Sequence, residues 1–273
     1  MADEPNPHHP SVYSFGETDL AARRLELVSR IFDPASEAFV AEALAATRPR
    51  LALDLGCGPG FTTRMLSRIG SPRRVIGMDR SESFLEWARA AAGGAEEYVG
   101  GDVLELPLRF GGGGERPDLI YARLLASHLD RPEQAISGWV GELAAGGFLL
   151  VEEVEGISTE VDVFERYLKV VAGMLSHHGN ELYVGPRLAE ARWEGDVAVE
   201  INRTVEVTPR VGNAARMFCM NLANWRHDPY IEATYSQREI GLLATELEEL
   251  LDRLDRGSIV WRIRQLALCR RPA

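Results

Sequence analysis

Short apolar runs alternate with helical patterns through the first half of the chain. Runs at 51–55, 74–79 and 118–122 are each followed by apolar residues at helical spacing. A short run at 97–99 and a longer one at 147–153 complete the series. Regular alternation of strands and helices predicts an α/β fold with a mostly parallel sheet and right-handed crossovers.

The pattern changes on both sides of this core. Before it, two helices are expected at 18–31 and 35–46, separated at Phe32-Asp33-Pro34, and lying over the ligand-binding edge of the sheet. After it, alternating β-branched runs predict a sixth and a seventh strand at 197–207 and 258–268. Helices are expected between the late strands, at 161–176, 186–193, 214–225 and 236–254. The chain therefore divides into four segments: a tail with helices over the 1–48 range, a core at 49–158, helical lid insertions with the sixth strand at 159–255, and a C-terminal strand at 256–273.

The first strand runs directly into a glycine-rich turn, within the sequence LALDLGCGPGFTT at 51–63. Glycines there let a ligand approach main-chain N–H groups closely. A dinucleotide-binding turn, G-x-G-x-x-G, would have its third glycine where Phe61 stands, which disfavours a nicotinamide-dependent oxidoreductase. The segment D-L-G-C-G-P-G resembles motif I of the class I S-adenosylmethionine-dependent methyltransferases, and this resemblance covers about residues 50–155.

The resemblance implies a Rossmann-like, seven-stranded, mostly parallel sheet, with the last strand antiparallel beside the fifth. It also implies S-adenosylmethionine as cofactor and S-adenosylhomocysteine as product. In that family the glycine turn packs under the methionine and ribose part of the cofactor, which here means Gly56, Cys57, Gly58 and Gly60. Asp54 would bond near the cofactor ammonium group, or would instead cap the turn.

The later strands carry the other cofactor residues that the resemblance implies. Asp79 ends the second strand about 20 residues beyond the turn and is suited to bind both ribose hydroxyls. Asp102 and the backbone of Val103 would contact adenine. The remaining candidates in the core are Arg80 on the adenine face, Phe84 on adenine or in the core, and Arg123 near the sulfonium. In the N-terminal segment, Tyr13 would close over the cofactor and Arg24 would pair with its carboxylate; the alternatives are a hydrophobic staple and a solvated helix face.

Two residues are candidates for a general base toward the methyl acceptor. His128 follows the fourth strand, and an imidazole with a pKa near ~6.5 suits proton removal at neutral pH. Its H-L-D-R-P context is equally consistent with a structural turn. Glu153 lies at the end of the fifth strand, where alternation places Glu153 and Glu155 on one face and Glu152 on the other. An acceptor carboxylate would need no base.

Polar and aromatic residues of the insertions predict the acceptor pocket. The candidates for substrate binding are His177, Asn180, Tyr183, Asn221 and Trp225. No metal site is expected, because the adjacent histidines at 177 and 178 would diverge on a helix, and the three cysteines are widely spaced.

Composition excludes several function classes. A formal charge of −11 over 273 residues gives no net basic field for nucleic acid or an anionic membrane. The sequence has no signal-like N-terminus and no apolar run of membrane-spanning length. These features predict a cytoplasmic protein. The sequence leaves the oligomeric state open between monomer and homodimer, since the N-terminal segment and the lid helices leave room for a dimer.

The function that these features predict is methyl transfer from S-adenosylmethionine to a small-molecule acceptor. Within the superfamily, the N-terminal helices, the H-L segment and the late helical insertion of this chain most resemble those of bacterial metabolite and natural-product methyltransferases. Oxygen or carbon is favoured as the acceptor atom, because His128 and the glutamates offer bases. The alternative is a protein of the same fold that binds the cofactor in a non-methylating role, such as a cyclase.

Overall fold

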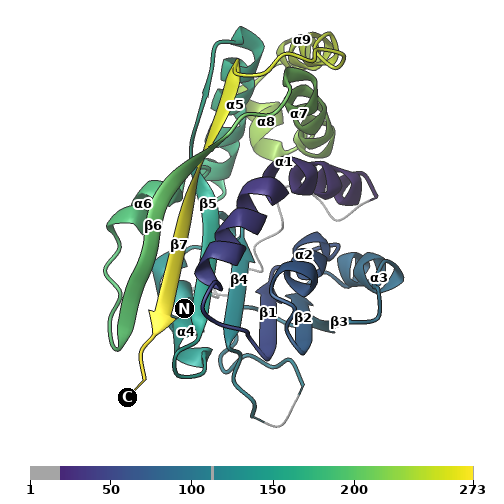
Figure 1. Ribbon diagram of the computed structural model, residues 1–273. Coiled ribbons are helices and arrows are strands. Elements are labelled where there is room, and N and C mark those ends of the chain that lie inside the picture. The colour runs from purple at the N-terminus through teal and green to yellow at the C-terminus, as the bar shows by residue number, and fades with distance from the viewer. Residues whose placement is uncertain (1–18, 112–113, 273) are drawn as a thin grey trace, which may run out of the picture.

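The computed structural model describes residues 19–111 and 114–272, and shows one seven-stranded sheet with helices on both faces (Figure 1). Tyr13 lies outside the described residues. The strands are β1 (Leu51–Leu55), β2 (Arg74–Asp79), β3 (Glu96–Gly100), β4 (Leu119–Arg123), β5 (Phe148–Thr159), β6 (Val197–Val207) and β7 (Ile259–Arg270). The α-helices are α1 (Asp19–Ala43), α2 (Phe61–Ile69), α3 (Glu82–Ala90), α4 (Pro132–Glu142), α5 (Asp162–His177), α6 (Gly185–Glu190), α7 (Val211–Trp225), α8 (Pro229–Thr234) and α9 (Gln237–Glu248).

The sheet has the order β3-β2-β1-β4-β5-β7-β6. The first five strands in this order run parallel, and β7 pairs antiparallel with both β5 and β6. The sequence-based expectation of a doubly wound sheet, with the last strand inserted antiparallel beside the fifth, is confirmed. The order reverses between β1 and β4, which places the ligand-binding crevice at the carboxyl ends of these strands.

Alternate residues of the central strands enter two different cores. Ala52 of β1 and Tyr121 of β4 pack with residues of α1 and α2. Leu53 of β1 and Ile120 of β4 pack on the opposite face, with residues of α4 and α6. Burial on both faces explains why these strands read as continuous apolar runs in the sequence.

The N-terminal helix differs from the prediction. The structure has one 25-residue helix, α1, with Pro34 inside it, where two helices were expected. Asp33, beside this proline, accepts a hydrogen bond from the Ser29 hydroxyl at 2.7 Å and forms an ion pair with Arg123 on β4. Because tertiary contacts hold the helix on both sides of the proline, the local break that proline usually causes does not end it.

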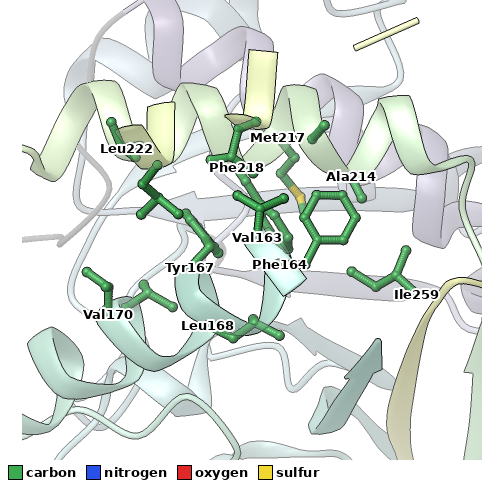
Figure 2. Packing of buried hydrophobic residues seen from close by; sticks show 14 of the residues in the cluster. Val163, Phe164, Tyr167, Leu168, Val170, Ala214, Met217, Phe218, Leu222 and Ile259 are labelled. Carbon is green, nitrogen blue, oxygen red and sulfur yellow. The ribbon is translucent and has the colours of Figure 1, made fainter. Parts of the chain in front are cut away.

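The late helices build a separate packed layer beyond the carboxyl ends of the strands. Val163, Phe164 and Tyr167 of α5 pack on Met217 and Phe218 of α7 (Figure 2). Residues of α1, α9 and β7 join the same cluster. The helices α5, α7, α8 and α9 of this layer are called the lid below. Among the described residues, no helix is both long and apolar enough to span a membrane.

Candidate functional site

Two of the three glycines in the turn between β1 and α2 have no room for a side chain. Gly56, Gly58 and Gly60 have φ values of +64°, +51° and +78°, a region that disfavours residues with a Cβ. A Cβ on Gly56 would lie 2.9 Å from the Leu125 side chain, and one on Gly60 would lie 2.5 Å from the Tyr98 hydroxyl. The sequence analysis did not find Leu125 or Tyr98, since neither belongs to a motif.

Asp79 joins this turn to the end of β2. The Gly58 amide donates to Asp79 Oδ2 at 2.8 Å, and the Ser81 amide donates to Oδ1 at 2.9 Å. The Cys57 amide donates to the Met78 carbonyl at 3.1 Å. Each carboxylate oxygen can accept further hydrogen bonds, so Asp79 remains suited to bind a pair of ligand hydroxyls.

Asp54 is buried beneath the turn. Its Oδ2 accepts hydrogen bonds from the hydroxyls of Thr62 and Thr63, at 2.7 and 2.6 Å. Burial raises the pKa of Asp54 to about 6, although both hydroxyls act in the opposite direction. A cation bound nearby would favour the ionised form, so the predicted contact with an ammonium group is chemically reasonable.

The turn after β3 lies beside Asp79. The Gly101 amide donates to the Asp79 carbonyl at 3.0 Å. Asp102 is exposed, and its Oδ1 accepts from the Leu104 amide at 2.8 Å, while Val103 is buried. Asp102 and Val103 are thus brought to the cofactor edge, and their contacts with adenine stay predictions.

The two other adenine candidates differ in exposure. Arg80 is exposed beside Asp79. Phe84 is 4% exposed and lies within the first turn of α3, where its amide donates to the Ser81 hydroxyl. Its burial agrees with the core role that the sequence left open.

His128 lies in a short 3₁₀ helix after β4, and its surroundings make it a weak base. Burial lowers the pKa of His128 to about 4, and the positive charges of Arg24 and Arg80 act in the same direction. The positive charge of Arg24, on α1, also acts on Tyr167 of α5. It lowers the pKa of the Tyr167 hydroxyl, although burial has the larger effect and raises this pKa. Arg24, Arg80, His128 and Tyr167 therefore share one region, where the glycine-turn edge meets the lid.

Arg123 points to α1. Its Nη1 donates to Asp33 Oδ1 at 2.8 Å and to the Ser36 hydroxyl at 3.1 Å, and its side chain is 7% exposed. A contact between Arg123 and the cofactor would have to compete with this buried ion pair.

Glu153 is fully buried, with an exposed fraction of 0%. Its Oε1 accepts a hydrogen bond from the Ala126 amide at 2.5 Å. The amides of Leu125 and Ser127 also act on this carboxyl, but burial outweighs them and raises the pKa of Glu153 to about 8. The side chain is therefore bound to the loop after β4, where the sequence had suggested a base facing an acceptor.

The neighbouring glutamates follow the expected alternation. Glu152 faces α1, accepting hydrogen bonds from the Tyr121 hydroxyl at 2.5 Å and from Gln265 at 2.9 Å. Glu155, on the opposite face, forms two hydrogen bonds of 2.7 Å with Arg264. Both carboxylates thus have structural partners.

The lid residues near Arg24 form a buried polar group around Tyr167. Asn221 Nδ2 donates to the Tyr167 hydroxyl at 2.9 Å. Asn221 Oδ1 and Trp225 Nε1 are buried and have no hydrogen-bond partner among the described residues. Two predicted residues, Asn221 and Trp225, therefore lie together around Tyr167, which the sequence analysis missed because it occupies an apolar position of a helix.

The other predicted substrate residues lie elsewhere. His177 is exposed at the end of α5 and stacks on Tyr230, with ring centroids 4.9 Å apart. Asn180 and Tyr183 line a cavity of about 480 Å³. Its other lining residues are Ala126, Leu129, Asp130, Ala172, Ser176, Gly179, Glu181, Leu182, Val184 and Arg187. The structure thus separates the five candidates into three places.

The site fits S-adenosylmethionine, and the described residues offer no metal centre. The glycines give the turn a backbone path with positive φ that other residues disfavour, Asp79 presents a carboxylate beside it, and Asp54 supplies an acid that a cationic ligand would stabilise. Over residues 19–111 and 114–272, no three histidine, cysteine or acidic residues are grouped as metal ligands.

Known proteins resemble this chain in sequence and in fold. A family model described as "Methyltransferase domain" matches residues 53–151. The trans-aconitate 2-methyltransferase of Paracidovorax citrulli is 34% identical over 70% of this chain and 74% of its own. That of Methylobacterium radiotolerans is 34% identical over 51% of this chain and 49% of its own, so this chain spans about half of that relative's length.

Solved structures extend the likeness to most of the chain. The plantazolicin methyltransferase BamL, in complex with S-adenosylhomocysteine, matches with a TM-score of 0.55 and 12% identity, over 93% of this chain and 90% of that chain. At that identity the match concerns the fold alone. Together with the motif, the sheet order and the relatives, it leads to one assignment: the chain belongs to the class I S-adenosylmethionine-dependent methyltransferases.

Proposed function

We propose that this protein transfers a methyl group from S-adenosylmethionine to a carboxylate oxygen of a small-molecule acceptor. The observation that carries the cofactor half of this proposal is the hydrogen bond between the Gly58 amide and Asp79, which builds the turn around a ribose-binding acid. S-adenosylmethionine supplies a methyl group already activated on sulfur, so the residues mainly have to position the acceptor.

The choice of a carboxylate rests on the two predicted bases. With a pKa of about 4, His128 is poorly matched to removing a proton from a hydroxyl or a carbon at neutral pH. Glu153 is buried against backbone amides. A carboxylate is already deprotonated at neutral pH and needs neither residue.

The proposal puts the acceptor beside Arg24 and the buried polar group around Tyr167, a region called the proposed pocket below. The Arg24 guanidinium and the Trp225 indole N–H are donors suited to a carboxylate, and the unpartnered Asn221 Oδ1 is suited to a hydroxyl. Relatives named as trans-aconitate methyltransferases make polycarboxylates the first acceptors to try. The sequence also predicts a role in bacterial secondary metabolism. The identity of the acceptor found in the screen below would bear on that prediction.

The test is an acceptor screen by mass spectrometry. Purified protein with S-adenosylmethionine is given a panel of di- and tricarboxylates, trans-aconitate included, beside phenols and amines. A methyl ester on a carboxylate is the expected product. Transfer to phenols or amines alone would reject the carboxylate proposal, and cofactor binding without any methylated product would favour a non-methylating role.

Two tyrosine variants locate the pocket. Tyr167→Phe removes a hydroxyl from the proposed pocket, whereas Tyr183→Phe removes one from the 480 Å³ cavity. We expect Tyr167→Phe to raise KM for the acceptor by about tenfold, in line with loss of one buried hydrogen-bonding group, and Tyr183→Phe to leave it within about twofold. The reverse result would move the acceptor to the cavity.

A further inference from the structure

The loop that follows β4 has an unusual backbone. Leu124 adopts a φ of +54°, which a residue with a branched side chain rarely occupies. Its amide donates to the Glu152 carbonyl at 2.8 Å, and the chain then forms the 3₁₀ turn Ala126–His128. Contacts from outside the loop must stabilise such a conformation.

One carboxylate gathers the amides of this loop. Glu153 Oε1 accepts from the Ala126 amide at 2.5 Å, and the amides of Leu125 and Ser127 and the Ser127 hydroxyl also act on this carboxyl group. Successive backbone N–H groups that face one concavity form a nest for an acceptor oxygen, and here that oxygen belongs to a side chain of the next strand. Glu153 Oε2 is buried and has no hydrogen-bond partner among the described residues. Burial of an acid costs free energy unless hydrogen bonds compensate for it, so the hydrogen bonds from the loop stabilise Glu153 in this place.

The loop in turn touches the two parts of the site. The Leu125 side chain lies against Gly56, so close that a Cβ there would be 2.9 Å from it. The His128 amide donates to the Leu125 carbonyl at 3.0 Å, so the imidazole is carried by the same turn. A shift of this loop would therefore move a wall of the glycine turn and His128 together.

We propose that Glu153 is a positioning residue, whose carboxyl group holds loop 124–128 so that Leu125 supports the glycine turn and His128 faces the acceptor region. Glu153 acts through the backbone and does not touch cofactor or acceptor. The effect of Glu153 on cofactor binding rests on the proposed function. The hold of Glu153 on loop 124–128, called the clamp below, is a property of the free protein.

Glu153→Gln tests the clamp with almost no change in volume. The glutamine amide keeps one acceptor oxygen, but places an NH₂ donor among the loop's N–H donors. We expect faster hydrogen exchange at the amides of 125–127, and a Kd for S-adenosylhomocysteine at least tenfold higher by calorimetry. Glu155→Gln is the matched control, because Glu155 lies on the same strand face and its carboxylate binds Arg264. It should leave both measurements unchanged.

The outcomes separate this inference from the proposed function. Unchanged exchange at 125–127 in Glu153→Gln overturns the clamp, whether or not cofactor binds. Faster exchange with wild-type affinity overturns its role in positioning the site. An equal loss of affinity in Glu155→Gln would mean that any lost carboxylate on β5 has the same effect, which also overturns it. If the wild-type protein binds no S-adenosylhomocysteine, the proposed function fails, while the exchange result still decides the clamp.

Discussion

The amide of Gly58 donates a 2.8 Å hydrogen bond to Asp79 Oδ2, which links the glycine turn to the end of β2. The other carboxylate oxygen accepts from the Ser81 amide. Asp79 thus stabilises the turn in addition to its proposed role in binding the ribose. The structural role and the proposed binding role can be measured separately.

Asp79→Asn should weaken both cofactor binding and the fold. The amide can satisfy one of the two backbone donors but opposes the other with its NH₂ group, which leaves one N–H poorly paired, at about 1–3 kcal/mol. We expect the affinity for S-adenosylhomocysteine to fall at least tenfold by calorimetry. Glu82→Gln, an exposed change in the first turn of α3, is the control and should bind as the wild type does. Equal binding by Asp79→Asn would contradict the ribose role.

Gly60→Ala should unfold more easily than Gly94→Ala. Both glycines have positive φ values, +78° and +94°, so both substitutions introduce backbone strain. Only at Gly60 does the new Cβ also meet an obstacle, the Tyr98 hydroxyl at 2.5 Å, whereas nothing lies within 4 Å at Gly94. We expect the free energy of unfolding in urea to fall by about 1–3 kcal/mol more at Gly60. Similar losses at both positions would show that the Tyr98 side chain moves away from the new Cβ at little cost.

Asp54 should make stability depend on pH in the direction opposite to that of a salt-bridged acid. Its folded-state pKa is about 6 against an ordinary value of 3.8, so the folded state binds the proton more tightly than the unfolded state. Its contribution is greatest below pH 4 and is lost as the pH rises through 6. The difference of roughly two units corresponds to about 3 kcal/mol.

The measurement is urea unfolding between pH 4 and 7 for the wild type and Asp54→Asn. The wild type should lose stability relative to the variant as the pH rises, since the asparagine does not titrate. Parallel curves for the two proteins would mean that Asp54 has an ordinary pKa in the folded state.

His128→Gln should reduce kcat only modestly. Removal of a general base slows an enzyme by about 10²–10⁴-fold, whereas a carboxylate acceptor needs no base. We expect a loss below about tenfold, and a wild-type pH profile of kcat/KM without an acid limb near 6.5, because the pKa of His128 lies near 4. A larger loss, together with a limb that the variant lacks, would restore His128 as the base.

The sheet could be predicted from the sequence because its signals are local. The strands Leu51–Leu55, Arg74–Asp79 and Val197–Val207 occur where apolar runs or alternation placed them. The break expected at Pro34 was wrong because the ion pair of Asp33 with Arg123, 90 residues away, supports the helix there.

The site was only partly predictable, because many of its contacts join residues that are far apart in the sequence. The glycines and Asp79 belong to a motif, and the structure brings them together. The contacts of Glu153, Arg123 and Tyr98 depend on which strands become neighbours. No spacing along the chain reveals that Glu153 would bind the amide of Ala126 or that Tyr98 would lie under Gly60.

The antiparallel strand β7 has a consequence for synthesis on the ribosome. Thr159 at the end of β5 pairs with Ile259 at the start of β7, so about a hundred residues must be translated before the edge of β5 is covered. At ~5–20 residues per second this takes about 5–20 s, during which an apolar parallel half-sheet has an open edge. The nascent protein is therefore most exposed to misassociation while its lid is being made, and slower translation of residues 160–258 would lengthen that interval.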